Sequence, residues 1–458
     1  MGLRKRTDAK TKSAKDMTVG DPRRLILAFA VPICLSQLFQ QLYNTADSVI
    51  VGNFIGKSAL AAVSSSGTLI YLLISFFTGL SMGAGVTISR YFGAGDYEKM
   101  SEAIHTNVAF GLVSGAVLTV FGVQATPAIL RWMGTDPRVL PQSILFFRYY
   151  FYGTPAIVMY NVFTGIMTAV GDSRRPLRYL IFSSVLNIAL DLTFIAGFRL
   201  NVGWAAVGTT IAQAASAVLC LVHLTRRGTV CRISLRRIRF HRDMLGEILR
   251  YGLPTGVETS VIGLANVIVQ TNINSFGEDA MAGYGSYIKI EGFAFLPITC
   301  FATALATFVS QNLGAGKHER AQKGARFGIR TSFLLAEAIG VFIFCFAPSL
   351  VGLFNRDPGV VAYGVRQART EALFFCLLAF SHCVAGICRG AGKAVVPMAI
   401  MLGVWCVFRI LYIRAAMSVS HDIALIFWAY PITWAISSAI YLVYYKKSNW
   451  VHGFDGPV

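Results

Sequence analysis

Ile88–Lys99 reads ISRYFGAGDYEK, and Val309–Arg320, which lies 221 residues further along the chain, reads VSQNLGAGKHER. Further pairs fall at an offset of 221 or 222: Gly56–Ala62 (GKSALAA) with Gly277–Gly283 (GEDAMAG), Gly171–Pro176 (GDSRRP) with Gly392–Pro397 (GKAVVP), and Pro32 with Pro254. Matches that recur at one offset indicate an internal duplication. A repeat of this kind in an apolar chain is typical of membrane transporters.

The composition predicts a polytopic membrane protein. The 458 residues are 55% hydrophobic and only 14% charged, with a mean hydropathy of +0.58, whereas soluble domains carry about 25% charged residues. No small-residue cleavage site follows the basic N-terminal segment, so we expect the first apolar stretch to remain as a helix. Twelve stretches are long enough to span a bilayer, at 25–52, 60–85, 103–123, 145–170, 177–198, 203–225, 247–274, 281–308, 327–347, 366–388, 394–417 and 423–445.

The net charge of +19 follows membrane topology. Most of the 41 Lys and Arg residues fall before the first span, between alternate spans and after the last one, so the positive-inside rule places both termini in the cytoplasm. We expect a multi-pass protein of the cytoplasmic membrane, whose Arg-rich 226–250 segment contacts anionic lipid headgroups rather than nucleic acid. The predicted organisation is a basic cytoplasmic segment (1–24), an N-lobe of helices one to six (25–225), a cytoplasmic linker (226–246), a C-lobe of helices seven to twelve (247–445) and a cytoplasmic tail (446–458).

The duplication constrains the architecture. Six spans per repeat return the chain to the same side, so the repeats are parallel and related by an axis along the membrane normal. We therefore predict an all-α fold of two pseudo-symmetric six-helix lobes. The GAG turns lack a preceding strand and a GxGxxG pattern, which excludes a dinucleotide site. Pro32 and Pro254 each bend the first helix of a lobe, either as a static kink or as a hinge.

A polar stripe marks the first span. Its residues recur every three or four positions and so share one helix face: Gln37, Gln40, Gln41, Asn44, Asp47 and Ser48. A stripe of this length is not compatible with lipid contact, and we expect it to line a cavity or a helix contact.

Two other spans place oxygen ligands at the depth of Asp47. With a rise of 1.5 Å per residue, Asp47, Asp191 and Thr209 all lie about 9–12 Å below the external surface, and Asn187 shares a helix face with Asp191. Oxygen ligands of these types suit Na⁺ or a shared proton, and two neighbouring carboxylates titrate as a unit. The alternative is that Asp47 and Asp191 only join helices through hydrogen bonds.

The other intramembrane polar residues leave several roles open. Glu258 either binds a cationic substrate or pairs structurally, and Glu291 is the expected partner of Arg409. Candidates for lining a substrate cavity are Gln37, Gln41, Asn44, Tyr160, Glu258, Tyr284 and Glu291. The nine Cys and seven His residues show no metal-ligand spacing, and no nucleophile–base constellation is evident, so we expect neither an enzyme nor a cofactor.

These residues together resemble the multidrug and toxic compound extrusion (MATE) family of the MOP superfamily, over about Asp21 to Lys447. The resemblance rests on Val31-Pro32, on Asn44–Gly52 (NTADSVIVG), on Ala59–Val63 (ALAAV), on both GAG turns, on Gly171-Asp172 before Pro176, and on Asn187-x-x-x-Asp191. It implies twelve helices in two lobes arranged as a V, and antiport of substrate against Na⁺ or H⁺. It also implies a prokaryotic-type cation site at Asp47, Asn187 and Asp191, with Thr209 as a fourth ligand by spacing.

We therefore expect a monomeric antiporter that exports amphipathic, cationic organic compounds. The alternative within the superfamily is a flippase or exporter of a lipid-linked or native metabolite. The sequence does not decide between Na⁺ and H⁺, because both use the same oxygen ligands, nor does it name the native substrate.

Overall fold

The computed structural model of the protein describes residues 16–55, 57–132 and 140–454, without the side chains of residues 48, 52, 53, 57–74 and 132. Most of the predicted N-terminal basic segment, the end of the tail and Ser48 of the polar stripe lie outside this description. Throughout the described part, the regular secondary structure is helical, which confirms the predicted all-α class.

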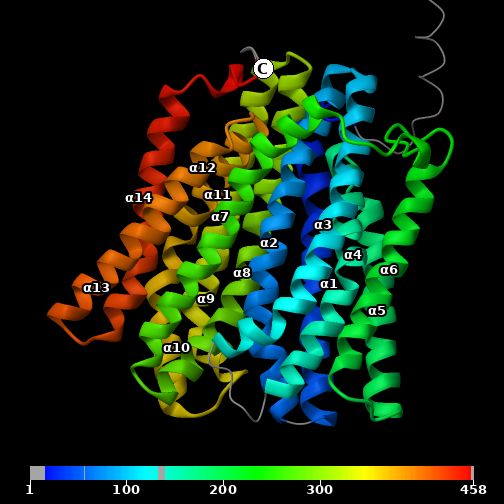
Figure 1. The fold of residues 1–458 in the computed structure, drawn as a ribbon. Coiled ribbons are helices and arrows are strands. Elements are labelled where there is room, and N and C mark those ends of the chain that lie inside the picture. The colour runs from blue at the N-terminus through cyan, green and yellow to red at the C-terminus, as the bar shows by residue number, and fades with distance from the viewer. Residues whose placement is uncertain (1–15, 56, 133–139, 455–458) are drawn as a thin grey trace, which may run out of the picture. The chain divides into compact units, whose positions relative to one another are not determined.

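Most of the α-helices are joined by short connections, and the longest described one runs from α6 to α7 (Figure 1). Their bounds are α1 (Pro22–Phe54), α2 (Lys57–Ala94), α3 (Tyr97–Trp132), α4 (Leu140–Ala169), α5 (Arg174–Asp191), α6 (Gly203–Thr225), α7 (Arg242–Asn274), α8 (Glu278–Gly314), α9 (His318–Gly352), α10 (Pro358–Glu371), α11 (Phe375–Gly390), α12 (Val395–Met401), α13 (Arg409–Val419) and α14 (Ile423–Lys447). The π-helices are η2 (Leu192–Gly197) and η5 (Leu402–Phe408), and the 3₁₀ turns are η3 (Leu235–Arg237), η4 (Ala372–Phe374) and η6 (Trp450–His452).

The helices account for the predicted membrane spans. Ten segments of the described chain are helical, long and apolar enough to cross a membrane, and α2 and α4, of 38 and 30 residues, are the remaining two. Three spans are interrupted: α5 continues into η2, α10 joins α11 through η4, and α12 joins α13 through η5.

The chain divides into two compact units that do not coincide with the two repeats. Unit 1 includes the first part of α7, which belongs to the second repeat, and unit 2 includes the first part of α1, which belongs to the first repeat. Unit 1 contains Leu35–Gly256, whereas unit 2 combines Met17–Cys34 with the chain from Val257 on. The predicted lobe boundaries fell between helices, but the units divide inside α1 and inside α7. Both divisions lie two residues after a proline, Pro32 or Pro254, at equivalent positions of the repeat.

Glycines bring α7 against α2 in unit 1. A Cβ atom on Gly83 would lie 2.2 Å from the backbone nitrogen of Gly252, and one on Gly79 would lie 2.4 Å from Gly256. Each helix therefore carries a pair of glycines four residues apart, the spacing that lets helix backbones approach closely in membranes. No larger residue fits this crossing unless the helices separate.

The equivalent crossing in unit 2 joins α1 to α8. Phe29 and Ala30 pack with Phe301 and Leu305 in one buried cluster. The chain before α1 is held as well, because the Met17 amide donates to Gln311 Oε1 (3.0 Å) and Arg320 donates to the Met17 carbonyl (3.2 Å).

Two cysteines occupy the positions in this crossing that Gly256 and Gly79 occupy in unit 1. The thiol of Cys34 lies against that of Cys300, and these residues are related to Gly256 and Gly79 by the repeat offset.

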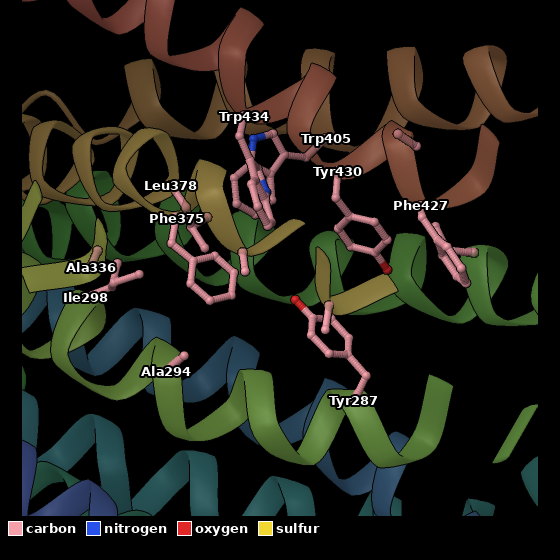
Figure 2. Packing of buried hydrophobic residues seen from close by; sticks show 14 of the residues in the cluster. Tyr287, Ala294, Ile298, Ala336, Phe375, Leu378, Trp405, Phe427, Tyr430 and Trp434 are labelled. Atoms are coloured by element: carbon pink, nitrogen blue, oxygen red, sulfur yellow. The ribbon is translucent and has the colours of Figure 1, made fainter. Parts of the chain in front are cut away.

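The largest core of unit 2 is aromatic. Figure 2 shows Phe375 of α11, Trp405 of η5, and Tyr430 and Trp434 of α14 gathered over α8, with Tyr287 below them. The cluster joins the two interrupted spans of unit 2 to α8 and α14. The rings of Trp405 and Tyr430 also lie against the guanidinium of Arg409.

We expect a variant that keeps only Cys34 and Cys300 to form an intramolecular disulfide when membranes are treated with copper phenanthroline, because the two thiols are in contact. The linked peptides are measured by mass spectrometry after proteolysis. A control that keeps Cys34 and Cys388 should give no link. Equal yields in the two variants would contradict the crossing of α1 and α8.

Candidate functional site

Asp47 of α1 and Asp191 of α5 face each other in unit 1. Their carboxyl groups lie within direct interaction range. Asp191 is fully buried, and Asp47 is half-buried. Two carboxylates in such proximity do not both carry charge unless a cation lies with them; otherwise they share a proton.

Asn187 and Thr209 complete one side of the site. Asn187, one turn before Asp191 and 2% exposed, donates from Nδ2 to Thr209 Oγ1 on α6 at 3.3 Å. This bond uses the side-chain nitrogen of Asn187, and its side-chain carbonyl oxygen has no hydrogen-bond partner. Gly208 lies next to Thr209, and a Cβ atom there would approach Asp191 Oδ1 to 2.6 Å. Glycine is therefore the only residue type at position 208 that leaves room for the Asp191 carboxylate in this position.

Buried oxygen atoms without a hydrogen-bond partner converge here. They are Asp47 Oδ1, Asn187 Oδ1, both carboxylate oxygens of Asp191, and Oε1 of Gln213 on α6. Buried polar atoms in native proteins nearly always have partners, so several unpartnered acceptor oxygens close to one another indicate a missing donor or cation. Asp47, Asn187, Asp191 and Thr209 lie close to one another in the structure, and their role as cation ligands stays a prediction.

Two residues of this cluster were missed from the sequence. Gln213 follows Thr209 by four residues on α6, and the hydroxyl of Tyr43, four residues before Asp47, lies against Gln213 and Gln40. Spacing of four places both on the face of a predicted ligand and could have identified them. The π-helix η2, which begins directly after Asp191, is a feature often found at functional sites.

The donor set fits a hard monovalent cation or a proton. Carboxylate, amide and hydroxyl oxygens are ligands of hard cations. Within the described residues, no cluster of three or more His, Cys, Asp or Glu side chains is present, so a site of the transition-metal type is not supported. Among these oxygen ligands, only the carboxyl groups of Asp47 and Asp191 can bind and release a proton as well as a cation.

The remaining cavity candidates of unit 1 are dispersed. Gln37 and Gln41 are half-buried and Asn44 is exposed, so the predicted stripe does not act as one buried face. Tyr160 is 8% exposed and packs in the apolar core of unit 1. None of these residues is among the unpartnered buried oxygens around Asp191.

Glu258 is engaged in a buried ion pair in unit 2. Arg389 Nη1 donates to both of its carboxylate oxygens, at 3.0 and 3.2 Å. Of the two predicted roles, the structure supports the structural one, because the carboxylate is neutralised. The predicted span 366–388 ends one residue before Arg389, whereas in the structure Arg389 lies in the last turn of α11.

The predicted ion pair between Glu291 and Arg409 is not formed. Arg409 is 1% exposed, donates to Thr433 Oγ1 (2.8 Å) and Asn266 Oδ1 (3.5 Å), and stacks over Tyr430 at 4.5 Å. No carboxylate in the described chain lies within 4.0 Å of its guanidinium nitrogens. A hydroxyl, an amide and a ring face take the place of the expected carboxylate.

The other acidic and aromatic groups of this region are also engaged. Tyr284 is buried and shares a hydrogen bond with Tyr430 (3.3 Å). Glu371 accepts a hydrogen bond from Gln367 at 2.9 Å.

The MatE family model matches the chain twice, at residues 32–193 and 254–413, so that the two matches begin at Pro32 and Pro254. The chain belongs to the MatE family. As a MatE protein it is a multi-pass membrane transporter rather than an enzyme, and its internal duplication is that of the family.

Several curated relatives align with nearly the whole MatE chain. Probable multidrug resistance protein YoeA of Bacillus subtilis is 27% identical over 92% of this chain and 93% of its own length. Probable multidrug resistance protein NorM of Thermotoga maritima is 25% identical over 84% of each chain. Multidrug export protein MepA of Staphylococcus saprophyticus is 24% identical over 83% of this chain and 84% of its own length.

Solved structures share the MatE fold. The crystal structure of MATE in complex with MaL6 matches at 24% identity with a TM-score of 0.89, covering 95% of this chain and 98% of that one. An outward-facing multidrug resistance MATE transporter of the MOP superfamily also matches at 24% identity with a TM-score of 0.89, covering 96% and 98% of the chains.

If the oxygens around Asp191 bind a cation, we expect Gly208→Ala to lower the affinity of this site for it about tenfold, a loss that corresponds to about 1.4 kcal/mol. The new methyl group displaces the flexible Asp191 carboxylate rather than a helix, so the protein still folds. The measurement is the cation concentration that gives half-maximal transport.

Gly85→Ala is the matched control, since a Cβ atom there meets nothing within 4 Å. Equal effects of the two substitutions would show that Asp191 does not need the space beside Gly208.

Proposed function

We propose that the protein is a secondary active antiporter that exports amphipathic, cationic organic compounds in exchange for Na⁺ or H⁺. The observation that carries this proposal is the group of unpartnered oxygens around Asp47 and Asp191 in unit 1. A carboxylate pair without a neighbouring cationic side chain is costly within a membrane. Binding of a cation or a proton from the outside removes that cost, and its release inside restores it.

Coupling follows from a difference in affinity between two conformations. If the acidic pair holds its cation more tightly in one conformation, cation binding shifts the population toward that conformation. Substrate that binds better in the other conformation then moves in the opposite direction. Pro32 and Pro254 mark the points where α1 and α7 pass between units, and we assign them the role of hinges.

Export of small compounds is favoured over flipping of a lipid-linked saccharide. Relatives are named as multidrug resistance or export proteins. A cavity for an anionic lipid pyrophosphate needs accessible basic groups, but Arg389 is paired with Glu258, and Arg409 is buried against Thr433. We further propose that the protein acts as a monomer in the cytoplasmic membrane with both termini in the cytoplasm.

We expect Asp47→Asn and Asp191→Asn each to lower gradient-driven export of an ethidium-like cation at least tenfold, since each removes one of the two charges that hold the coupling ion. Export is measured in proteoliposomes with Na⁺ and H⁺ gradients imposed separately, so that the same assay identifies the ion. The exposed carboxylate of Glu98 provides the control, and Glu98→Gln should transport normally. Normal export by both Asp variants would exclude this site as the coupling site.

We expect Pro32→Ala and Pro254→Ala to slow export several-fold without changing the cation concentration for half-maximal activity. Alanine restores the missing backbone hydrogen bond and stiffens each helix where it changes units. Pro348→Ala, at an exposed position inside α9, controls for the loss of a helical proline. A static kink would instead leave the export rate unchanged in both hinge variants.

A further inference from the structure

The segment that joins α6 to α7 is a fixed element of unit 1 with two different faces. Cys231 and Ile233, which are 3% and 1% exposed, insert into the core of unit 1, and Met244 follows them. The backbone is held at three points: the amides of Ile233, Ser234 and His241 donate to the Leu224 carbonyl (2.8 Å), His105 Nε2 (3.0 Å) and Thr106 Oγ1 (3.2 Å).

The opposite face of the segment is basic. Its exposed arginines are Arg226, Arg227, Arg232, Arg236, Arg237 and Arg239. No acidic residue occurs between Arg226 and Arg242, and none of these arginines belongs to an ion pair of the described chain. Within the described chain, no carboxylate therefore forms an ion pair with any of these arginines.

Apolar side chains interrupt this basic face. Leu235 is 64% exposed and Phe240 is 46% exposed, although each adjoins an arginine in the sequence. The exposed side of the segment therefore combines apolar and basic side chains. Arginines mixed with exposed Leu and Phe are characteristic of segments that lie in the membrane interface.

The position of residues 226–241 in the chain also agrees with a location in the membrane interface. It leaves the end of the α6 span at Thr225 and returns to the α7 span at Arg242, as the green trace above α6 shows in Figure 1. Both ends are therefore at a membrane boundary, and the positive-inside rule places that boundary at the cytoplasmic leaflet, which carries anionic lipids.

We propose that residues 226–241 form a binding site for anionic phospholipid headgroups, in which Arg232, Arg236, Arg237 and Arg239 hold the phosphates while Leu235 and Phe240 enter the acyl boundary. The site is independent of the proposed transport function. Because the segment is tied to α3 through His105 and Thr106, a bound lipid anchors the start of α7 to the scaffold of unit 1.

The test measures binding of fluorescent phosphatidylglycerol and phosphatidylcholine to the purified full-length protein in detergent. We expect phosphatidylglycerol to bind more tightly. The combined variant Arg232→Gln/Arg236→Gln/Arg237→Gln/Arg239→Gln should weaken its binding at least tenfold, as expected from a severalfold effect per arginine. Leu235→Ser/Phe240→Ser should weaken binding of both lipids.

A matched variant removes four exposed arginines elsewhere: Arg131→Gln/Arg199→Gln/Arg356→Gln/Arg414→Gln. It should bind phosphatidylglycerol like the parent protein, and both variants are checked for folding by thermal unfolding. If both quadruple variants lost phosphatidylglycerol binding equally, the effect would be due to net charge alone, and the proposed binding site would be wrong. Displacement of the lipid by millimolar glycerol 3-phosphate would assign the arginines to a soluble phosphate, and tighter binding of an RNA oligonucleotide would assign them to nucleic acid. Either result would overturn the lipid assignment.

Discussion

The absence of water from the hydrocarbon core of a bilayer is the constraint on which this structure depends. Every backbone amide and carbonyl within a span needs a partner in the protein, and helices supply it. Hydroxyl side chains follow the same rule by donating to the carbonyl one turn back, as Thr119 does to Gly115 and Thr331 to Phe327. The unpartnered oxygens near Asp191 differ from other unpartnered buried atoms, such as the hydroxyls of Ser143 and Ser332, because several of them come together at one place.

The duplication preserves the scaffold but not the chemistry. The crossing of the first helix of each repeat is conserved in position, with glycines at one crossing and Cys34 and Cys300 at the other. At the same offset, however, Asp47 falls on Ile268, Asn187 on Phe408 and Asp191 on Tyr412. The charges of unit 2 are instead organised as a pair between Glu258 and Arg389 and as a guanidinium enclosed by Tyr430, Trp405 and Thr433.

The sequence was most informative where a single helix determined the answer. Helical spacing and depth were enough to bring Asp47, Asn187, Asp191 and Thr209 to one place, because each lies within a span whose direction across the membrane the sequence predicts. Contacts between distant spans were not accessible in the same way. Arg389 reaches Glu258 across 131 residues, and periodicity specifies the face of a helix but not the residue that it meets. For the same reason, the division of α1 and α7 between the units was not predicted.

That division has a consequence for how the protein is made. Met17–Cys34 leaves the ribosome first, yet its partners Phe301, Gln311 and Arg320 are synthesised almost three hundred residues later. The first part of α1 therefore cannot pack against its partners until α8 and α9 have been synthesised. Neither repeat can mature alone, because each lacks the helical segment that the other provides. Folding of the first repeat during synthesis is thus left unfinished until the second one arrives.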